Sequence, residues 1–164
     1  MEIEKKTKDF KSLSRVVKTA DLEEIFLTSS NVWRDIDALN CENINAKIGF
    51  GGELLNLGDG HFTAKVNFSI KGTCKDEEEG EERDIIKIEV EYVLAYSLTG
   101  EALPKKDDLG PFCEINAVYN AWPYCREYIQ TTTNRMGVPA LTLPLLKFRP
   151  PKRKKAIEKE KKGK

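Results

Sequence analysis

The clearest pattern along the chain is the alternation of apolar and polar residues in its middle part. Apolar residues occupy every second position from Phe62 to Ile70, and again from Ile86 to Tyr96. A period of two places alternate side chains on opposite faces of a strand, so the first stretch predicts a β-strand with one buried face. The second half of the other strand is apolar on both faces, which predicts that a helix or another subunit covers that end of the sheet. The sequence Gly58-Asp59-Gly60 before the first stretch is typical of a hairpin turn.

Two more strands are expected earlier in the chain. Residues 44–50 alternate in the same way, and the β-branched and aromatic residues that begin at Leu22 favour a strand over a helix. Residues 29–43 are rich in Ser, Asn and Asp and predict a connection, which carries Val32 and Trp33 either as a lid over the core or as the lip of a binding groove. The glycine cluster at residues 49–52 predicts a bulge or turn.

Helical spacing appears at both ends of this central region. Apolar residues within 10–20 recur at three- and four-residue intervals, as on one face of a helix. A longer stripe runs from Val118 to Thr133, with a kink or restart expected at Pro123 and a helix end at Gly137. Residues 138–148 are apolar but contain two prolines, which predicts an extended segment that is neither helix nor central strand.

Length and charge suggest one domain with a basic tail. The chain has 164 residues, of which 27 are basic and 27 acidic, a net charge of zero. From Lys147 onward, however, ten residues are basic and two acidic, which gives +8 there and −8 in the rest. We expect a flexible N-terminus at 1–9, a folded domain at 10–148 and a disordered tail at 149–164. The tail could contact RNA or an acidic partner, but it lacks aromatic residues for base stacking, so nucleic-acid binding is not favoured.

No motif in the chain points to catalysis, a cofactor or a metal. The four cysteines are widely spaced, and His61 is the single histidine available for a zinc site or a cysteine–histidine pair. There is no nucleotide-binding loop and no apolar stretch of about 20 residues that would span a membrane. We therefore expect a cytoplasmic protein that is not an enzyme, without structural disulfides.

Large apolar residues stand instead in segments without regular structure. These residues are Val32, Trp33, Leu141, Leu143, Leu145 and Leu146. Beside an antiparallel sheet, such segments either cap the core or line a groove for an extended polypeptide.

The C-terminal part of this pattern resembles the SecB family of export chaperones, in particular its SecB-like branch. That family has an aromatic-Pro-Tyr-x-Arg-Glu helix ending near Arg-x-Gly, followed by an apolar run with a Pro-x-Leu-x-Leu pattern. The matching residues are Trp122, Pro123, Tyr124, Arg126, Glu127, Ile129, Arg135, Gly137, Pro139, Leu141 and Leu143. The rest of the chain agrees with the family in its order of strands.

The resemblance implies an α+β fold, in which a four-stranded antiparallel sheet carries a long kinked C-terminal helix on one face. It also implies a homo-oligomer, a dimer or a tetramer, that binds unfolded or pre-secretory chains in apolar grooves without ATP and serves protein export. By this analogy the residues that serve the long helix and its packing are Trp122, Pro123, Tyr124, Arg126 and Glu127. The expected groove residues are Phe26, Val32, Trp33, Ile48, Phe50, Leu141, Leu143 and Leu145.

The partners follow from the same resemblance. They are unfolded polypeptides, the SecA motor, or, in the alternative reading, one dedicated partner such as the antitoxin of a toxin–antitoxin module. Family members dock to SecA through acidic surface, whereas this chain ends in basic residues after Pro150-Pro151, so the sequence leaves docking to SecA open.

Overall fold

The computed structural model describes residues 2–3, 13–37, 44–75, 82–100 and 103–148. Strand β1 spans Glu2–Ile3, β2 Ala20–Arg34, β3 Asn45–Gly58, β4 His61–Lys75, β5 Glu82–Leu98 and β6 Lys147–Phe148. Helix α2 spans Lys106–Phe112, the π-helical turn η1 Cys113–Ala117 and helix α3 Val118–Arg135, while residues 13–17 form a short helix. The predicted tail at 149–164 and most of the predicted flexible N-terminus lie outside the described residues.

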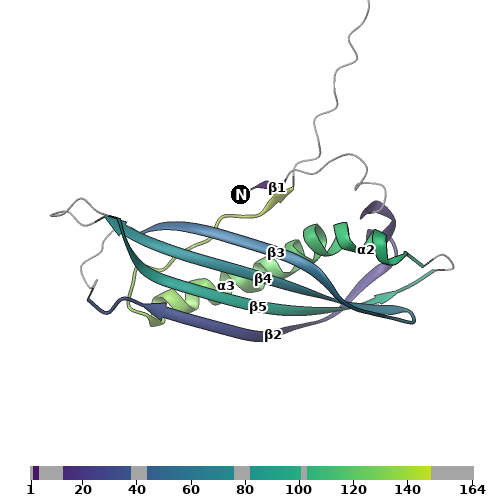
Figure 1. Ribbon diagram of the computed structural model, residues 1–164, viewed down its shortest axis with the longest axis horizontal. Coiled ribbons are helices and arrows are strands. Elements are labelled where there is room, and N and C mark those ends of the chain that lie inside the picture. The colour runs from purple at the N-terminus through teal and green to yellow at the C-terminus, as the bar shows by residue number, and fades with distance from the viewer. Residues whose placement is uncertain (1, 4–12, 38–43, 76–81, 101–102, 149–164) are drawn as a thin grey trace, which may run out of the picture.

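Four of the strands form one antiparallel sheet in the order β2-β5-β4-β3 (Figure 1). The two alternating stretches become the central strands β4 and β5, and their apolar positions are buried. The hairpin between β3 and β4 turns at Asp59-Gly60, where Gly60 has a φ of 72°, as a tight turn requires. The predicted α+β fold with a four-stranded antiparallel sheet is confirmed.

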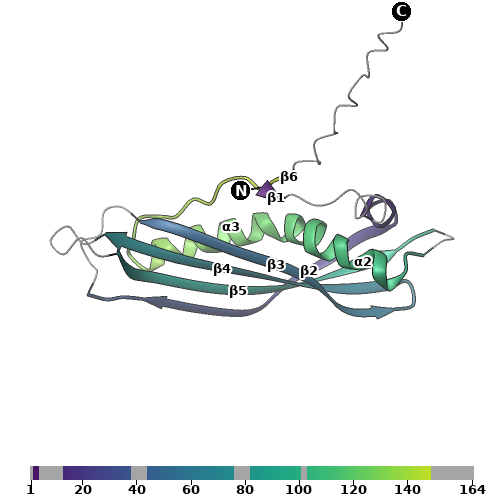
Figure 2. The same ribbon diagram turned by 45° about the horizontal axis from the view of Figure 1, so that its top comes forward.

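The helices cover one face of this sheet, and the opposite face is left open (Figures 1 and 2). The core lies between the two layers, where the rings of Phe62 and Tyr96 stack at 4.8 Å and Phe112 meets both edge-on. At a second place in the core, Trp122 of α3 packs against Phe68 of β4, with ring centroids 5.6 Å apart. Burial of these aromatic side chains supplies much of the driving force for folding.

Strand β2 is longer than the sequence predicts. It continues through residues 29–34, which were expected to belong to a connection, because these residues pair with β5 from Ser29 opposite Glu91 to Arg34 opposite Ile86. Backbone pairing in a sheet outweighs the weak strand preference of Ser and Asn. Of the remaining residues of the expected connection, 35–37 follow the strand in a turn, and 38–43 lie outside the described residues.

The glycine cluster does not form the predicted bulge or turn, because β3 runs straight through it. The register shift of the β3–β4 pair lies at Leu54/Asn56 instead. A Cβ atom on Gly52 would lie 2.1 Å from the carbonyl oxygen of Cys113, so glycine is required there for the close approach of η1 to the strand. Close packing against a helix is thus the physical reason for this glycine.

The helical region also departs from the prediction. The polar stretch before it contains the short helix α2, which the sequence pattern did not indicate. Helix α3 passes through Pro123 without restarting, and the departure from α-helical geometry comes earlier, at η1. The predicted end at Gly137 is confirmed: its φ is 67°, and its N–H bonds to the carbonyl of Asn134.

The chain after α3 is extended, as predicted. Residues 138–146 contain no helix or strand, and β6 then pairs in parallel with β1 at the other end of the sequence. We call residues 138–146 the extended segment. It runs back along the helical layer, as Figure 2 shows.

Candidate peptide-binding surface

Strand β2 is an edge strand that exposes large apolar side chains on both of its faces. The sheet order leaves one side of β2 without a neighbouring strand among the described residues. Its exposed side chains are Leu22 at 40%, Phe26 at 46%, Leu27 at 48%, Val32 at 40% and Trp33 at 44%. A long edge strand with such side chains is a template for pairing with another extended chain.

The register with β5 divides these residues between the two faces of the sheet. Leu22 and Leu27 lie opposite Tyr96 and Tyr92, whose buried rings point toward the helices. Val32 lies opposite buried Ile88 and shares that face. We call Leu22, Leu27 and Val32 the inner strip of β2, because residues directly opposite each other in an antiparallel pair share a face.

The other two side chains lie on the open face. Phe26 is opposite Val93, and Trp33 is opposite Lys87, whose ammonium group lies 5.1 Å from the centroid of the indole ring. An extended chain added beside β2 would direct alternate side chains toward the inner strip and toward these two aromatic residues.

Helix α3 covers β3, β4 and β5 but leaves the inner strip of β2 exposed. At the far end of β2, the guanidinium group of Arg34 donates a hydrogen bond to the carbonyl oxygen of Met136, just past α3. Burial raises the pKa of Tyr92 beneath the helix, and nearby Cys125, Tyr128 and Glu127 of α3 raise it further. The edge strand is therefore anchored at its end while its apolar side chains stay uncovered.

The eight groove residues expected from the sequence do not form one surface. Phe26, Val32 and Trp33 lie on β2, as described above. Ile48, Phe50 and Leu141 are half-buried and pack against the core, Leu143 is buried with 2% of its surface exposed, and Leu145 is 63% exposed. The structure therefore places three of the eight residues on β2, with Val32 on the inner face and Phe26 and Trp33 on the open face, and the leucines at 141, 143 and 145 in the extended segment.

Side chains of α3 hold the extended segment in place through its backbone. The Nε1 of Trp122 donates a hydrogen bond of 3.0 Å to the carbonyl oxygen of Pro144, and the Nε of Arg126 donates one of 2.9 Å to that of Leu143. The backbone N–H of Leu141 donates to the hydroxyl of Thr133 at 3.0 Å. These bonds satisfy backbone polar groups of a proline-containing segment that cannot join a helix or sheet. They also give a structural role to Trp122 and Arg126 of the C-terminal motif.

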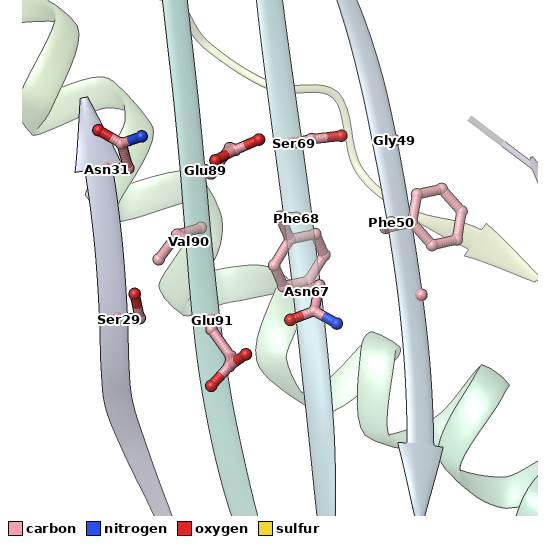
Figure 3. Close-up of a pocket in the computed structure, with 11 residues that line it drawn as sticks. Ser29, Asn31, Gly49, Phe50, Asn67, Phe68, Ser69, Glu89, Val90 and Glu91 are labelled. Carbon is pink, nitrogen blue, oxygen red and sulfur yellow. The ribbon is translucent and has the colours of Figure 1, made fainter. Parts of the chain in front are cut away.

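The open face of the sheet is hollowed near its centre (Figure 3). The hollow has a volume of about 460 Å³ and lies over all four strands of the sheet. Polar side chains from three strands surround it: Ser29, Asn31, Asn67, Ser69, Glu89 and Glu91. Glycines at 49 and 51 contribute no side chains, which leaves the hollow open toward β3.

Two cysteines of the described residues, Cys113 and Cys125, are free and buried. Burial raises the pKa of the thiols of Cys113 and Cys125 to about 12, so both are protonated at neutral pH. His61 is exposed in the β3–β4 hairpin, and its Nδ1 lies 3.0 Å from the carbonyl oxygen of Asp59. In the part of the chain that the structure describes, no group of three or more His, Cys, Asp or Glu side chains could hold a metal ion.

Two further observations bear on the expected location. Cys74 is disulfide-bonded, so the expectation of no structural disulfide is wrong. That expectation came from the presumed compartment and not from any residue pattern. None of the helices in the described ranges has the length and hydropathy needed to cross a bilayer.

Sequence reasoning missed Leu22 and Leu27 as exposed residues of this surface. Both lie in a stretch that is predicted to be an ordinary strand, and the sequence alone does not show which strand of a sheet lies at the edge. The one available signal was the apolar–polar pattern of residues 22–28, which has no clean alternation and therefore suits a strand that no layer covers on either face.

Comparison with known proteins supports the fold. No protein-family model and no curated protein matches the sequence. The SecB-like chaperone Rv1957 of Mycobacterium tuberculosis, solved in complex with a ChAD peptide from the HigA1 antitoxin, has a similar structure with a TM-score of 0.74 and 17% identity, over 85% of this chain and 99% of that one.

A second solved structure is more distant. It is a protein of unknown function from Streptococcus agalactiae, with a TM-score of 0.42 and 11% identity over 77% of this chain and 97% of the other, and a likeness at this level supports no inference. The first comparison, together with the sheet order and the long C-terminal helix, shows that the chain has the fold of the SecB-like chaperones.

Proposed function

We propose that the protein is an ATP-independent holdase that binds extended apolar segments of unfolded polypeptides along β2. The observation that carries this proposal is the free edge of β2 with five large apolar side chains exposed on its two faces. The likeness of the fold to that of a SecB-like chaperone solved with a bound peptide supports it.

Binding along an edge strand combines two kinds of contact. Main-chain hydrogen bonds to the strand are independent of the sequence of the client, which suits a chaperone with many clients. The apolar side chains add affinity, and covering the exposed part of a leucine or valine is worth about 1 kcal/mol each. Two register shifts, between Leu22/Glu24 and between Leu27/Ser29, divide the edge, and residues 29–34 form its longest regular stretch.

The experiment is an aggregation assay with a matched pair of variants. Chemically unfolded model protein is diluted into buffer that contains the purified protein and no nucleotide, and light scattering is followed. We expect suppression near stoichiometric ratios by the wild type and weaker suppression by Leu27→Ser/Val32→Ser. The control is Leu55→Ser/Leu57→Ser, which removes leucines of similar exposure, 46% and 44%, from the other edge strand. Equal behaviour of the two variants would show that β2 is not the client surface.

A second function is favoured by one specific observation: the similar solved chaperone carries a peptide of an antitoxin. In this alternative, β2 accepts one dedicated partner and few other clients. Absence of suppression by a folded wild-type protein would exclude the general holdase and support the dedicated role. Co-purification from the native organism would then identify that partner.

We also propose that the chain forms a homo-oligomer, a dimer or a tetramer, through its helical layer. Tyr119 and Tyr124 of α3 leave 54% and 51% of their surfaces exposed, which is unusual for large aromatic side chains outside an interface. Light scattering coupled to size-exclusion chromatography gives the mass, and Tyr119→Ser/Tyr124→Ser should reduce it. An unchanged mass would place the interface elsewhere.

Location and export are separate proposals. We place the protein in the cytoplasm, and cell fractionation is the deciding measurement, since the disulfide of Cys74 is atypical of a reducing compartment. A role in export predicts that the protein binds an unfolded precursor and passes it to SecA. Adding both to the aggregation assay tests this role.

A further inference from the structure

Three lysines and a tryptophan stand in one row across the open face of the sheet. The strand register places Lys47 opposite Lys71, Lys71 opposite Lys87, and Lys87 opposite Trp33. The side chains of Lys71 and Lys87 are 51% and 53% exposed, and Lys47 is exposed as well. We call these four residues the lysine row.

Within the fold, this arrangement is unfavourable. Like charges directly opposite each other on neighbouring strands repel and destabilise a sheet. Asp84 bridges two of the lysines, with its carboxylate oxygens 2.9 Å from the Nζ of Lys71 and 3.1 Å from that of Lys87. Lys47 has no ion pair among the described residues. Two of the three ammonium groups therefore share one carboxylate and the third is unpaired, so the row itself keeps an excess of positive charge.

The hollow in the open face adjoins the row directly. The next two rows toward the centre of the sheet contain Asn31, Glu89 and Ser69, then Ser29, Glu91 and Asn67, and all six line the hollow. At its β3 end, a Cβ atom added to Gly51 would meet nothing within 4 Å. The site thus combines a cationic rim, an aromatic surface and a recess lined by hydroxyl, amide and carboxylate groups, with the two carboxylates of Glu89 and Glu91 on β5.

We propose that the lysine row and the adjoining hollow bind an extended acidic segment of a partner protein. Its carboxylates would pair with the lysine ammonium groups, its main-chain amides would hydrogen-bond with the Ser and Asn side chains, and an apolar side chain would lie on Trp33. Charge complementarity gives such a site its selectivity and a fast association rate. The inference does not depend on the holdase function, since it concerns charged residues on the open face.

The same chemistry argues for a peptide over a nucleic acid. Glu89 and Glu91 follow the lysine of β5 on the same face, so a phosphodiester chain leaving the row would meet carboxylates. Nucleic-acid affinity also comes from many phosphate contacts, and the row offers three cations. A peptide can place acidic residues at the row and neutral ones over the hollow.

The test uses a fluorescein-labelled peptide in which glutamates alternate with alanine and leucine, with fluorescence anisotropy as the readout at low ionic strength. The variant is Lys47→Gln/Lys71→Gln, which leaves Lys87 with its contacts to Asp84 and Trp33. The control is Lys18→Gln/Lys106→Gln, which removes the same charge from exposed positions outside the sheet. Circular dichroism and thermal melting verify that both variants are folded.

We expect the wild type to bind the peptide, the row variant to bind about tenfold more weakly, and the control to change by less than about twofold. Added salt should weaken binding by screening the exposed charges. Absence of peptide binding by the wild type, or equal losses in the two variants, would overturn the proposal. If a short oligothymidylate bound more tightly than the peptide and the row variant lost this binding, the ligand would be a nucleic acid and the proposal of an acidic peptide would be overturned. Suppression of aggregation should stay normal in the row variant, so this test is independent of the holdase assay.

Discussion

The sharpest test of the fold compares two leucines that lie two positions apart in the extended segment. Leu143 is 2% exposed and belongs to the core cluster, whereas Leu145 is 63% exposed. Truncation of a buried leucine to alanine removes its apolar contacts and leaves a cavity, which costs about 2–5 kcal/mol. Truncation of an exposed leucine costs less than about 0.5 kcal/mol. We therefore expect Leu143→Ala to lower the free energy of unfolding by about 3 kcal/mol and Leu145→Ala to leave it nearly unchanged.

Urea unfolding followed by circular dichroism measures both changes. The midpoint should fall for Leu143→Ala at an unchanged slope, because a smaller core side chain alters stability and not the surface exposed on unfolding. For a chain of this size, the loss corresponds to a drop in Tm of about 6–12 °C. Leu145→Ala controls for the effect of losing a leucine from the same segment.

The result that would refute this reasoning is a small and equal effect of the two substitutions. It would mean that the extended segment does not pack against α3 as described, and that Leu143 is available to clients, as the sequence suggested. A stable Leu143→Ala protein with weaker suppression of aggregation would point the same way. A large loss of stability in Leu143→Ala alone assigns Leu143 to the core.

Three other expectations follow from particular contacts. Gly52→Ala should destabilise the protein by about 2 kcal/mol or more, because the new Cβ would collide with the backbone carbonyl oxygen of Cys113, 2.1 Å away. Gly51→Ala, whose Cβ would meet nothing within 4 Å, should be neutral or slightly stabilising, and thermal melting of the two variants measures the difference. Arg126→Met should cost about 1–2 kcal/mol in urea unfolding, because it leaves a carbonyl of the extended segment without its donor. Cys113 and Cys125 should resist iodoacetamide at pH 8 until denaturant is added, because burial raises the pKa of their thiols to about 12 and keeps them protonated; mass spectrometry detects the label.

The central strands and the long helix could be predicted because the spacing of their apolar residues matches the face of each element that is buried. In β4 and β5 one face is buried under helices, so apolar residues recur at every second position, without a break from Phe62 to Ile70 and with additional apolar residues on the other face in the second half of β5. In α3 the buried positions, Val118, Ala121, Trp122, Cys125, Ile129 and Thr133, follow helical spacing. Where one layer covers an element along its whole length, periodicity is sufficient.

The surface could be predicted only in part, because it depends on pairings between distant segments. Val32 and Trp33 were predicted to line a groove because they are large apolar residues in a stretch expected to be a polar connection, and they do lie exposed on the edge strand. Leu143 looked equivalent to Leu145 in sequence, and only the packing of the extended segment shows that one belongs to the core and the other is exposed. The lysine row is invisible in sequence, since its members come from four strands and only the register aligns them.

Helix α3 holds the extended segment through hydrogen bonds but leaves the inner strip of β2 uncovered, and this difference explains the architecture. Through Trp122, Arg126 and Thr133 it binds the backbone of the extended segment, so that this segment completes the core on one side. On the other side, Arg34 of β2 donates a hydrogen bond to the carbonyl oxygen of Met136 just past the helix, which fixes the end of the strand, while the inner strip stays exposed. If a second extended segment of the same chain covered β2, the fold would be more stable but would have no free edge for a partner. No strand among the described residues pairs with the outer edge of β2, which agrees with our proposal that another polypeptide completes the sheet there.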